Sequence, residues 1–123
     1  MKKLKILVLD DEKVIVDVFS RLMKQFNYDA DFFVDTDAAI KAIAKNPAAY
    51  SMLVCDIKMP KTDGISFAGQ VRILCPQLPI IFMTGFPTDA VREKIGKMEK
   101  TTLLEKPFPI RETFQELIPK LLK

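Results

Sequence analysis

Five short apolar runs alternate with segments of helical periodicity along the whole chain. Between the runs, apolar residues recur every three or four positions, which is the spacing of one face of an α-helix. We expect strands at residues 4–9, 28–34, 51–55, 80–83 and 101–104, and helices at residues 15–26, 38–44, 65–74, 88–98 and 110–121. Strands that alternate with helices pair in parallel and are covered on both faces. The sequence therefore predicts an α/β fold, a single doubly wound (βα)₅ domain over residues 1–123.

Local signals mark where two of the helices begin or end. Asp35-Thr36-Asp37 offers a cap for the second helix, and Asn46-Pro47 stops it. Pro87 suits the first turn of the fourth helix, where a missing N–H costs nothing. The fourth helix is the weakest amphipath of the five, which makes it a candidate surface for a protein partner.

The composition is that of an ordinary globular protein. Hydrophobic residues make up 49% and charged residues 28% of the 123 residues, so the chain can bury a substantial core. A net charge of +3, with lysines spread along the chain, is too weak to indicate direct binding of nucleic acid. The first apolar run is too short, and too soon interrupted by Asp10, for a signal peptide or a membrane span. We therefore expect no contact with nucleic acid or membrane.

The cysteine and histidine content narrows the chemistry. Cys55 and Cys75 lie in apolar surroundings without a CxxC spacing, so we expect packed free thiols rather than a disulfide or a zinc site. Reduced thiols fit a cytoplasmic protein. The chain has no histidine, which excludes a Ser-His-Asp hydrolase and a histidine phosphocarrier.

Polar side chains follow four of the five strands, at the points where the strands end. Asp10 and Asp11 follow the first strand, Asp56 the third, Thr84 the fourth and Lys106 the fifth. Because the carboxyl ends of parallel strands share the edge where ligands bind, we expect these groups to converge. Three carboxylates would repel one another without a cation, and oxygen ligands of this kind suit Mg²⁺. Capping of the next helix is the alternative for Asp10 or Asp11, but it does not explain the other three residues.

A magnesium ion beside a carboxylate, a hydroxyl and an ammonium indicates phosphoryl transfer, because that reaction depends on positioning and on neutralising charge. Asp56 is the candidate nucleophile and would form an acyl phosphate. Mg²⁺ and Lys106 would neutralise the phosphoryl oxygens, and the Thr84 hydroxyl would hydrogen-bond one of them. A plain ion pair between Lys106 and an aspartate is the alternative, and it would also be the resting state of the same site.

Four segments carry a resemblance to a known family: ILVLDDE at 6–12, VCDIKMPKTDG at 54–64, MTG at 83–85 and EKPF at 105–108. In their order and spacing, the whole chain resembles the receiver domain of two-component response regulators. The resemblance implies a flavodoxin-like, CheY-like fold with strand order 2-1-3-4-5. It also implies that Asp56 accepts a phosphoryl group from a histidine of a sensor kinase or of a histidine phosphotransfer protein.

The resemblance further implies how a cation is held and how the signal leaves the domain. Mg²⁺ would be bound by Asp11, Asp56 and the backbone carbonyl of Lys58, and through water by Asp10. The chemistry would be limited to self-phosphorylation and slow autodephosphorylation, so the protein would be a signalling phosphoacceptor rather than an enzyme. Output would pass to a downstream protein target or to a missing output domain.

Further positions match the family pattern. Thr84 and Lys106 match its sensing hydroxyl and lysine, and Pro107 matches the position that usually follows a cis bond, which would aim the lysine inward. Met59-Pro60 and Gly64 match the loop that shapes the site.

Several features depart from the pattern or add to it. Leu103 stands where the family usually has an aromatic residue on its last strand, so our hypothesis is that this chain does not form the usual symmetric dimer through the fourth helix, fifth strand and fifth helix. Lys58 and Phe86 would overhang the phosphoryl group and restrict water, although a solvated lysine and a packed phenylalanine are an equal alternative. Phe108-Pro109 is a candidate exposed contact surface, with ordinary packing of Phe108 beneath the last helix as the alternative.

Two other functional classes share parts of this pattern. A Mg²⁺-dependent phosphohydrolase with an aspartyl nucleophile usually has a second aspartate at the position of Lys58, and it needs a cap over its substrate. A flavin- or nucleotide-binding protein of the same fold needs a glycine- or hydroxyl-rich loop where this chain has Asp10-Asp11-Glu12, which would repel phosphate. Both are weaker interpretations than a phosphoacceptor.

Overall fold

The computed structural model describes residues 4–58 and 63–122. Its strands are β1 (Lys5–Leu9), β2 (Asp29–Phe33), β3 (Met52–Asp56), β4 (Ile80–Thr84) and β5 (Thr101–Glu105). Its helices are α1 (Lys13–Gln25), α2 (Thr36–Lys45), α3 (Gly64–Leu74), α4 (Asp89–Gly96) and α5 (Ile110–Leu121), with a 3₁₀ turn at Pro47–Ala49 before β3. The strands pair in parallel in the order β2-β1-β3-β4-β5. The predicted fold class and strand order are confirmed.

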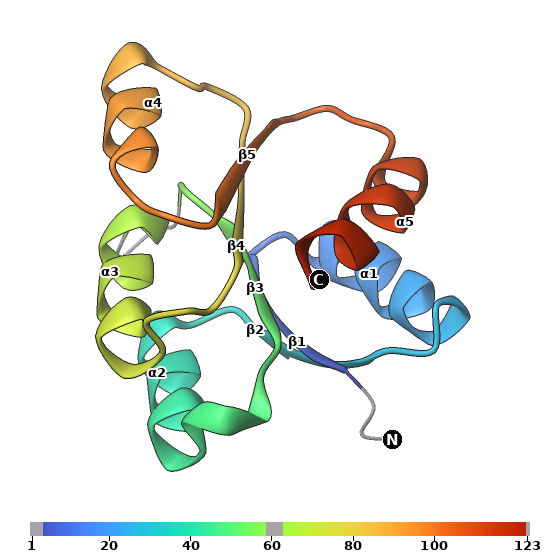
Figure 1. The fold of residues 1–123 in the computed structure, drawn as a ribbon. Coiled ribbons are helices and arrows are strands. Elements are labelled where there is room, and N and C mark those ends of the chain that lie inside the picture. Colours follow the sequence, from blue (N-terminus) through green and yellow to red (C-terminus); the bar gives the residue numbers. More distant parts are fainter. Residues whose placement is uncertain (1–3, 59–62, 123) are drawn as a thin grey trace.

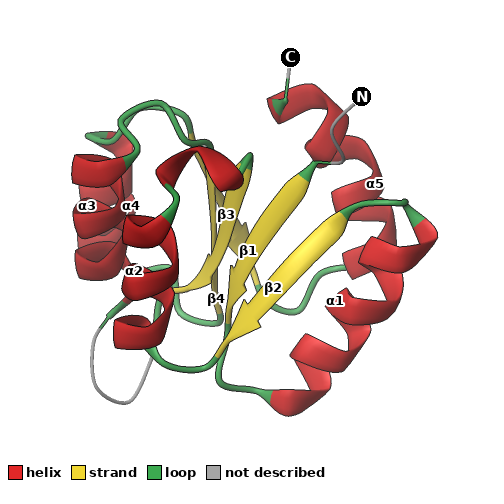
Figure 2. Cartoon of the chain, turned by 90° about the horizontal axis from the view of Figure 1, so that it is seen from below, coloured by secondary structure: helices red, strands yellow, loops and turns green. Residues whose placement is uncertain are grey.

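Helices cover both faces of the sheet. α1 and α5 lie on one face, and α2, α3 and α4 lie on the other (Figures 1 and 2). Because successive side chains of a strand point to opposite faces, β1 supplies both cores. Leu7 and Leu9 pack with residues of α2 and α3, whereas Ile6 and Val8 pack with residues of α1 and α5. All residues of β3 and β4 are buried, as expected for interior strands of a parallel sheet.

Side-chain caps fix where α2 and α4 begin. The Asp35 carboxylate accepts a hydrogen bond from the Asp37 N–H at 3.1 Å, which confirms the predicted cap. The Thr88 hydroxyl accepts a hydrogen bond from the Val91 N–H at 3.2 Å, so Thr88 caps α4. Pro87 therefore precedes the helix, and the prediction that it lies in the first turn is wrong.

Phe108 joins the core between β5 and α5. Its ring centroid lies 6.0 Å from that of Phe114, which is fully buried and makes an edge-on contact with Phe19 at 4.8 Å. Phe108 is half-buried, while Pro109 is exposed. Of the two alternatives for Phe108, the structure shows packing beneath the last helix, and only Pro109 is exposed.

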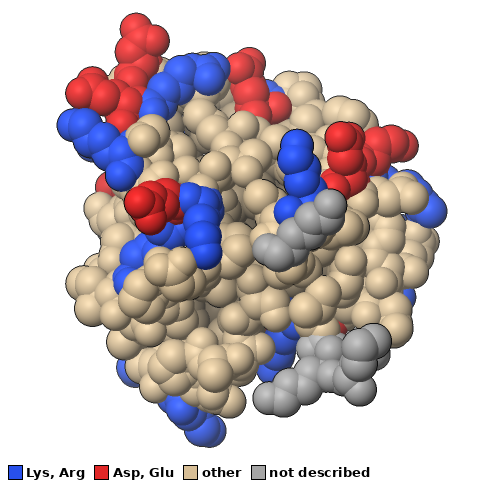
Figure 3. Space-filling view, viewed as in Figure 1, with Lys and Arg blue, Asp and Glu red and all other residues tan. Residues whose placement is uncertain are grey.

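Other general expectations can be compared with the structure. Cys55 is buried, Cys75 is half-buried, and both are free thiols, as predicted. Within residues 4–58 and 63–122, no helix combines the length and apolar character needed to cross a bilayer. On the face of the molecule seen in Figure 3, basic and acidic side chains lie close together toward the upper margin, and the charged residues drawn there form no broad patch of a single sign.

Candidate functional site

The carboxyl edge of the sheet collects the polar residues singled out in the sequence. Asp10 directly follows β1, Asp56 ends β3, Thr84 ends β4 and Lys106 directly follows β5. The parallel register places the ends of β3 and β4 side by side, with Asp56 opposite Met83. The predicted convergence of these residues on one edge therefore follows from strand order and register.

Three carboxylates form an acidic cluster at this edge. Asp10, Asp11 and Asp56 each offer an oxygen atom, and these three atoms lie within 4.8 Å of one another. Asp10 and Asp56 are 0% and 5% exposed, whereas Asp11 is exposed. The Asp10 carboxylate accepts a hydrogen bond from the Glu12 N–H at 2.8 Å, and the Asp56 carboxylate accepts one from the Lys58 N–H at 3.3 Å. These backbone contacts fix the two buried carboxylates.

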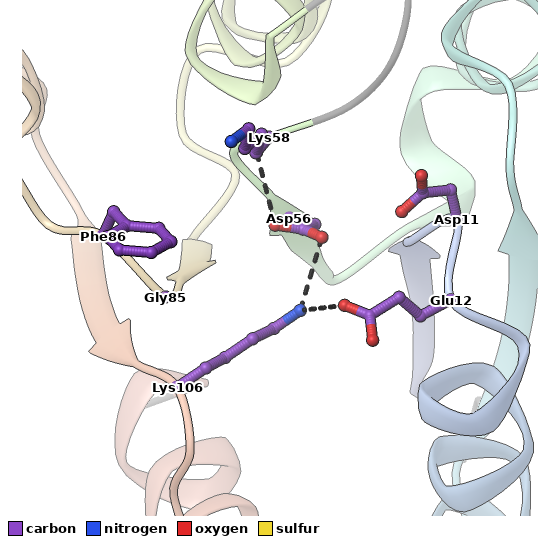
Figure 4. A pocket seen from close by; sticks show the side chains of 7 residues that line it. All are labelled: Asp11, Glu12, Asp56, Lys58, Gly85, Phe86 and Lys106. Carbon is purple, nitrogen blue, oxygen red and sulfur yellow. Dashed lines mark hydrogen bonds and ion pairs between the residues drawn. The ribbon is translucent and has the colours of Figure 1, made fainter.

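Lys106 reaches into the acidic cluster from the end of β5. Its Nζ lies 3.3 Å from Asp56 Oδ2 and 3.2 Å from Glu12 Oε1 (Figure 4). It also lies 3.4 Å from Asp10 Oδ2. The Lys106 N–H donates to the Thr84 carbonyl at 2.7 Å, and the Lys106–Pro107 bond is cis, as the resemblance implied. The ion pair with aspartate is thus present. The contact between Lys106 and Glu12 was not predicted from the sequence. The position of Glu12 directly after Asp10-Asp11 could have indicated it.

Thr84 shares the edge but its hydroxyl oxygen is engaged elsewhere. The residue is 4% exposed, and its Oγ1 accepts a hydrogen bond from the Phe86 N–H at 3.1 Å. This contact directs the oxygen toward the loop between β4 and α4. Because Oγ1 is the acceptor in this bond, the hydroxyl can still donate its proton to another group.

An open pocket of about 630 Å³ lies over the cluster. It is lined by Asp11, Glu12, Asp56, Lys58, Gly85, Phe86 and Lys106 (Figure 4). Lys58 and Phe86 come from different loops, and the Lys58 Nζ lies 5.8 Å from the centroid of the Phe86 ring, a cation–π distance. Phe86 is 75% exposed, so the ring borders the pocket rather than filling the core.

Gly64 lies directly behind Asp56. Its N–H donates to the Ile57 carbonyl at 2.6 Å, and a Cβ added at this position would lie 2.3 Å from the Asp56 carbonyl oxygen and 2.8 Å from Cys55 Sγ. Only glycine fits this close approach, which confirms that Gly64 shapes the site. Met59-Pro60, expected to contribute to the same loop, lies outside the described residues.

Comparison with known proteins identifies the arrangement. The family model for the response regulator receiver domain matches residues 6–118. The chain belongs to this family. Transcriptional regulatory protein RprY of Bacteroides fragilis is 32% identical over 114 residues, which are 90% of this chain and 46% of RprY. Response regulator receiver protein CpdR of Brucella abortus is 27% identical over 118 residues, or 96% of this chain and 97% of CpdR.

Solved structures agree with the family assignment. Vibrio cholerae chemotaxis protein CheY4 superposes with a TM-score of 0.87 at 24% identity over 98% of this chain and 100% of CheY4, which shows the shared fold. The beryllofluoride-activated NtrC4 receiver domain, a dimer in solution, superposes with a TM-score of 0.84 at 28% identity over 96% of this chain and 95% of NtrC4. This receiver domain spans less than half of RprY but nearly all of CpdR.

The electrostatics of the receiver domain's acidic pocket are unbalanced. Burial raises the pKa of the Asp10 and Asp56 carboxyls, and this outweighs the lowering effect of the Lys106 ammonium. Burial opposes the charge on Lys106 as well, but the combined attraction of Asp10 and Asp56 raises its pKa above the ordinary value. One ammonium thus does not compensate the carboxylates that surround it.

The donor set fits the Mg²⁺ that receiver domains bind at an acidic pocket. The three carboxylates supply oxygen ligands only, and a hard divalent cation prefers such ligands while keeping several waters. Asp11 is exposed and borders the open pocket, which leaves room for those waters. A divalent cation would also offset the cost of burying these charges, which is the main reason that their pKa values are raised, and it would reduce the repulsion between the carboxylates.

Proposed function

We propose that this receiver domain accepts a phosphoryl group on Asp56 from a phosphohistidine of a sensor kinase or a histidine phosphotransfer protein. A carboxylate oxygen of Asp56 attacks phosphorus, the phosphorus–nitrogen bond of the donor breaks, and the imidazole nitrogen leaves with the bonding electron pair and takes up a proton. The product is an acyl phosphate. The observation that carries this proposal is the position of Asp56, which is 5% exposed, borders the pocket and lies 3.3 Å from the Lys106 ammonium.

The surrounding residues support this reaction through charge and position. Asp10, Asp11, Asp56 and the Lys58 backbone carbonyl would hold Mg²⁺, which supplies positive charge opposite the phosphoryl oxygens. Lys106 lies close enough to Asp56 to transfer its ion pair from the carboxylate to a phosphoryl oxygen.

Thr84 would report the new charge. Its hydroxyl would turn to donate its proton to a phosphoryl oxygen, and this turn would alter the hydrogen bond that the oxygen accepts from the Phe86 N–H. This movement would couple the β4–α4 loop to the phosphorylation state and signal to a downstream protein partner. We place the domain, over residues 1–123, in the cytoplasm, where its two free thiols stay reduced.

The test is phosphorylation with acetyl phosphate and Mg²⁺, followed by intact-mass analysis. The wild-type protein should gain one PO₃H unit, and the gain should disappear in EDTA and in Asp56→Asn. Asp89→Asn, which removes an exposed aspartate at the start of α4, should leave the adduct unchanged. An adduct of equal yield in Asp56→Asn would contradict the proposal.

A further inference from the structure

We propose that Glu12 is a positioning residue that tethers Lys106 and weakens the hold of the pocket on a phosphoryl group. The inference rests on the proposed function, because it concerns how the same lysine is shared between the resting and phosphorylated states. The Lys106 Nζ contacts three carboxylates, and its distance to Glu12, 3.2 Å, is the shortest of the three. Figure 4 shows the ammonium lying between the Asp56 and Glu12 carboxylates.

The direction of the Glu12 side chain is a second observation. Glu12 is the N-cap residue of α1, but its side chain makes no capping hydrogen bond. The first turn of α1 also lacks an acidic residue, so the free N–H groups at this helix start have no charged partner from that turn. The Glu12 carboxylate instead crosses the pocket margin to reach Lys106. The side chain therefore serves the pocket rather than its own helix.

The contact has opposite consequences for the two ligands of the site. A phosphoryl group on Asp56 needs the Lys106 ammonium, and it must compete with Glu12 for this cation. The Glu12 carboxylate also lines the pocket and repels a second anion there. The Glu12 carboxylate should instead strengthen the binding of a divalent cation, because its negative charge attracts the ion.

Two conservative variants separate the effect of the contact between Glu12 and Lys106 from the effect of the negative charge of Glu12. Glu12→Gln removes the charge, whereas Glu12→Asp keeps it on a side chain that is one methylene shorter and can turn to cap α1 instead. Because the Glu12 side chain is 58% exposed, neither change should impair folding. Asp17→Asn, an exposed change on α1 away from the pocket lining, is the matched control.

Calorimetric titration with beryllofluoride at saturating Mg²⁺ gives the decisive measurement. Both Glu12 variants should bind this phosphoryl mimic roughly two- to fivefold more tightly than the wild type, the range expected for a partly exposed ion pair. Mg²⁺ alone should bind more weakly to Glu12→Gln and about equally to Glu12→Asp. Asp17→Asn should match the wild type in both titrations.

The outcomes discriminate between the explanations. Tighter beryllofluoride binding in Glu12→Gln alone would mean that the charge of Glu12 acts through space and not through its contact with Lys106. Unchanged binding in both variants would mean that Glu12 has no role. Either result would overturn the proposal. If the wild type itself binds no beryllofluoride, the proposed function fails, and the tether is judged by nuclear magnetic resonance of the Lys106 ammonium in the ligand-free protein. Its protons should exchange faster with water in Glu12→Gln than in Asp17→Asn, and equal exchange would refute the contact.

Discussion

Replacing Lys106 with methionine tests whether one ammonium holds the acidic pocket together. Methionine keeps much of the apolar stem but leaves Asp10 and Asp56, with side chains 0% and 7% exposed, without their cation. At 3.3 Å and an effective dielectric constant of about 20, each ion pair is worth about 5 kcal/mol before the cost of burying the charges is counted. Breaking a buried pair by removing one partner typically costs about 3–5 kcal/mol. Because the Lys106 side chain retains 19% exposure, we expect Lys106→Met to lose about 3 kcal/mol, the lower end of that range.

The loss should depend on pH in a defined direction. The folded-state pKa values of Asp10 and Asp56 are already raised by burial, and removing the ammonium raises them further. A raised folded pKa means that the folded state binds protons more readily than the unfolded state, so stability falls as pH rises through the interval between the two values. The destabilisation of Lys106→Met should therefore be largest at pH 8 and shrink as the pH is lowered toward 4.

Urea unfolding followed by circular dichroism, in EDTA and in excess Mg²⁺, measures both effects. Mg²⁺ at about 100 times its dissociation constant should stabilise the wild type by about 2.7 kcal/mol, and the variant by more, because the ion replaces the missing positive charge. Lys97→Met, which removes only an exposed pair with Glu93 on α4, is the control and should change stability by less than about 0.5 kcal/mol. A loss below about 1 kcal/mol in EDTA at pH 8, with no dependence on pH, would refute the reasoning.

Four further substitutions probe the same pocket. Gly64→Ala places a methyl group against the Asp56 backbone, so unfolding free energy should fall by about 1–3 kcal/mol and phosphorylation by acetyl phosphate should slow. Lys58→Ala and Phe86→Ala each open the margin of the pocket to water, so the acyl phosphate should decay faster; equal or longer lifetimes in both would count against this. Asp10→Asn should stabilise the protein in EDTA at pH 7, because the buried charge is removed, and the gain should vanish as the pH falls toward 4 and the wild-type carboxyl becomes protonated.

The sheet was predictable because its interior strands are buried on both faces. β1 and β3 appear in the sequence as continuous apolar runs, and the polar residue that ends each run lies at the carboxyl edge. Boundaries were less certain where side-chain caps decide them, as at Thr88, which caps α4 so that the helix begins at Asp89 and Pro87 lies outside it. The 3₁₀ turn at Pro47–Ala49 was not predicted, since Asn46-Pro47 indicated only where α2 stops.

The members of the site were predictable, but their contacts were not. Strand order brings Asp10, Asp56 and Lys106 to the same edge of the sheet. The contact between Glu12 and Lys106 depends on the direction of a long side chain at a helix start, which no periodicity sets. The Thr84 hydroxyl likewise accepts from a local backbone N–H, and the sequence offers no signal for that choice.

The charge imbalance of the pocket links stability to function. Asp10, Asp56 and Glu12 all contact the Lys106 ammonium, and an Asp11 oxygen lies within 4.8 Å of those of Asp10 and Asp56. The ligand-free fold therefore maintains like charges in close proximity, at a cost that its two apolar cores must offset. Neutralising a buried carboxylate would reduce that cost, but it would also weaken the binding of the cation on which the proposed phosphorylation depends. A site built to bind Mg²⁺ and then a phosphoryl group is therefore expected to lower the stability of the empty domain. Variants of this edge that raise stability in EDTA should lose Mg²⁺ affinity in the same order.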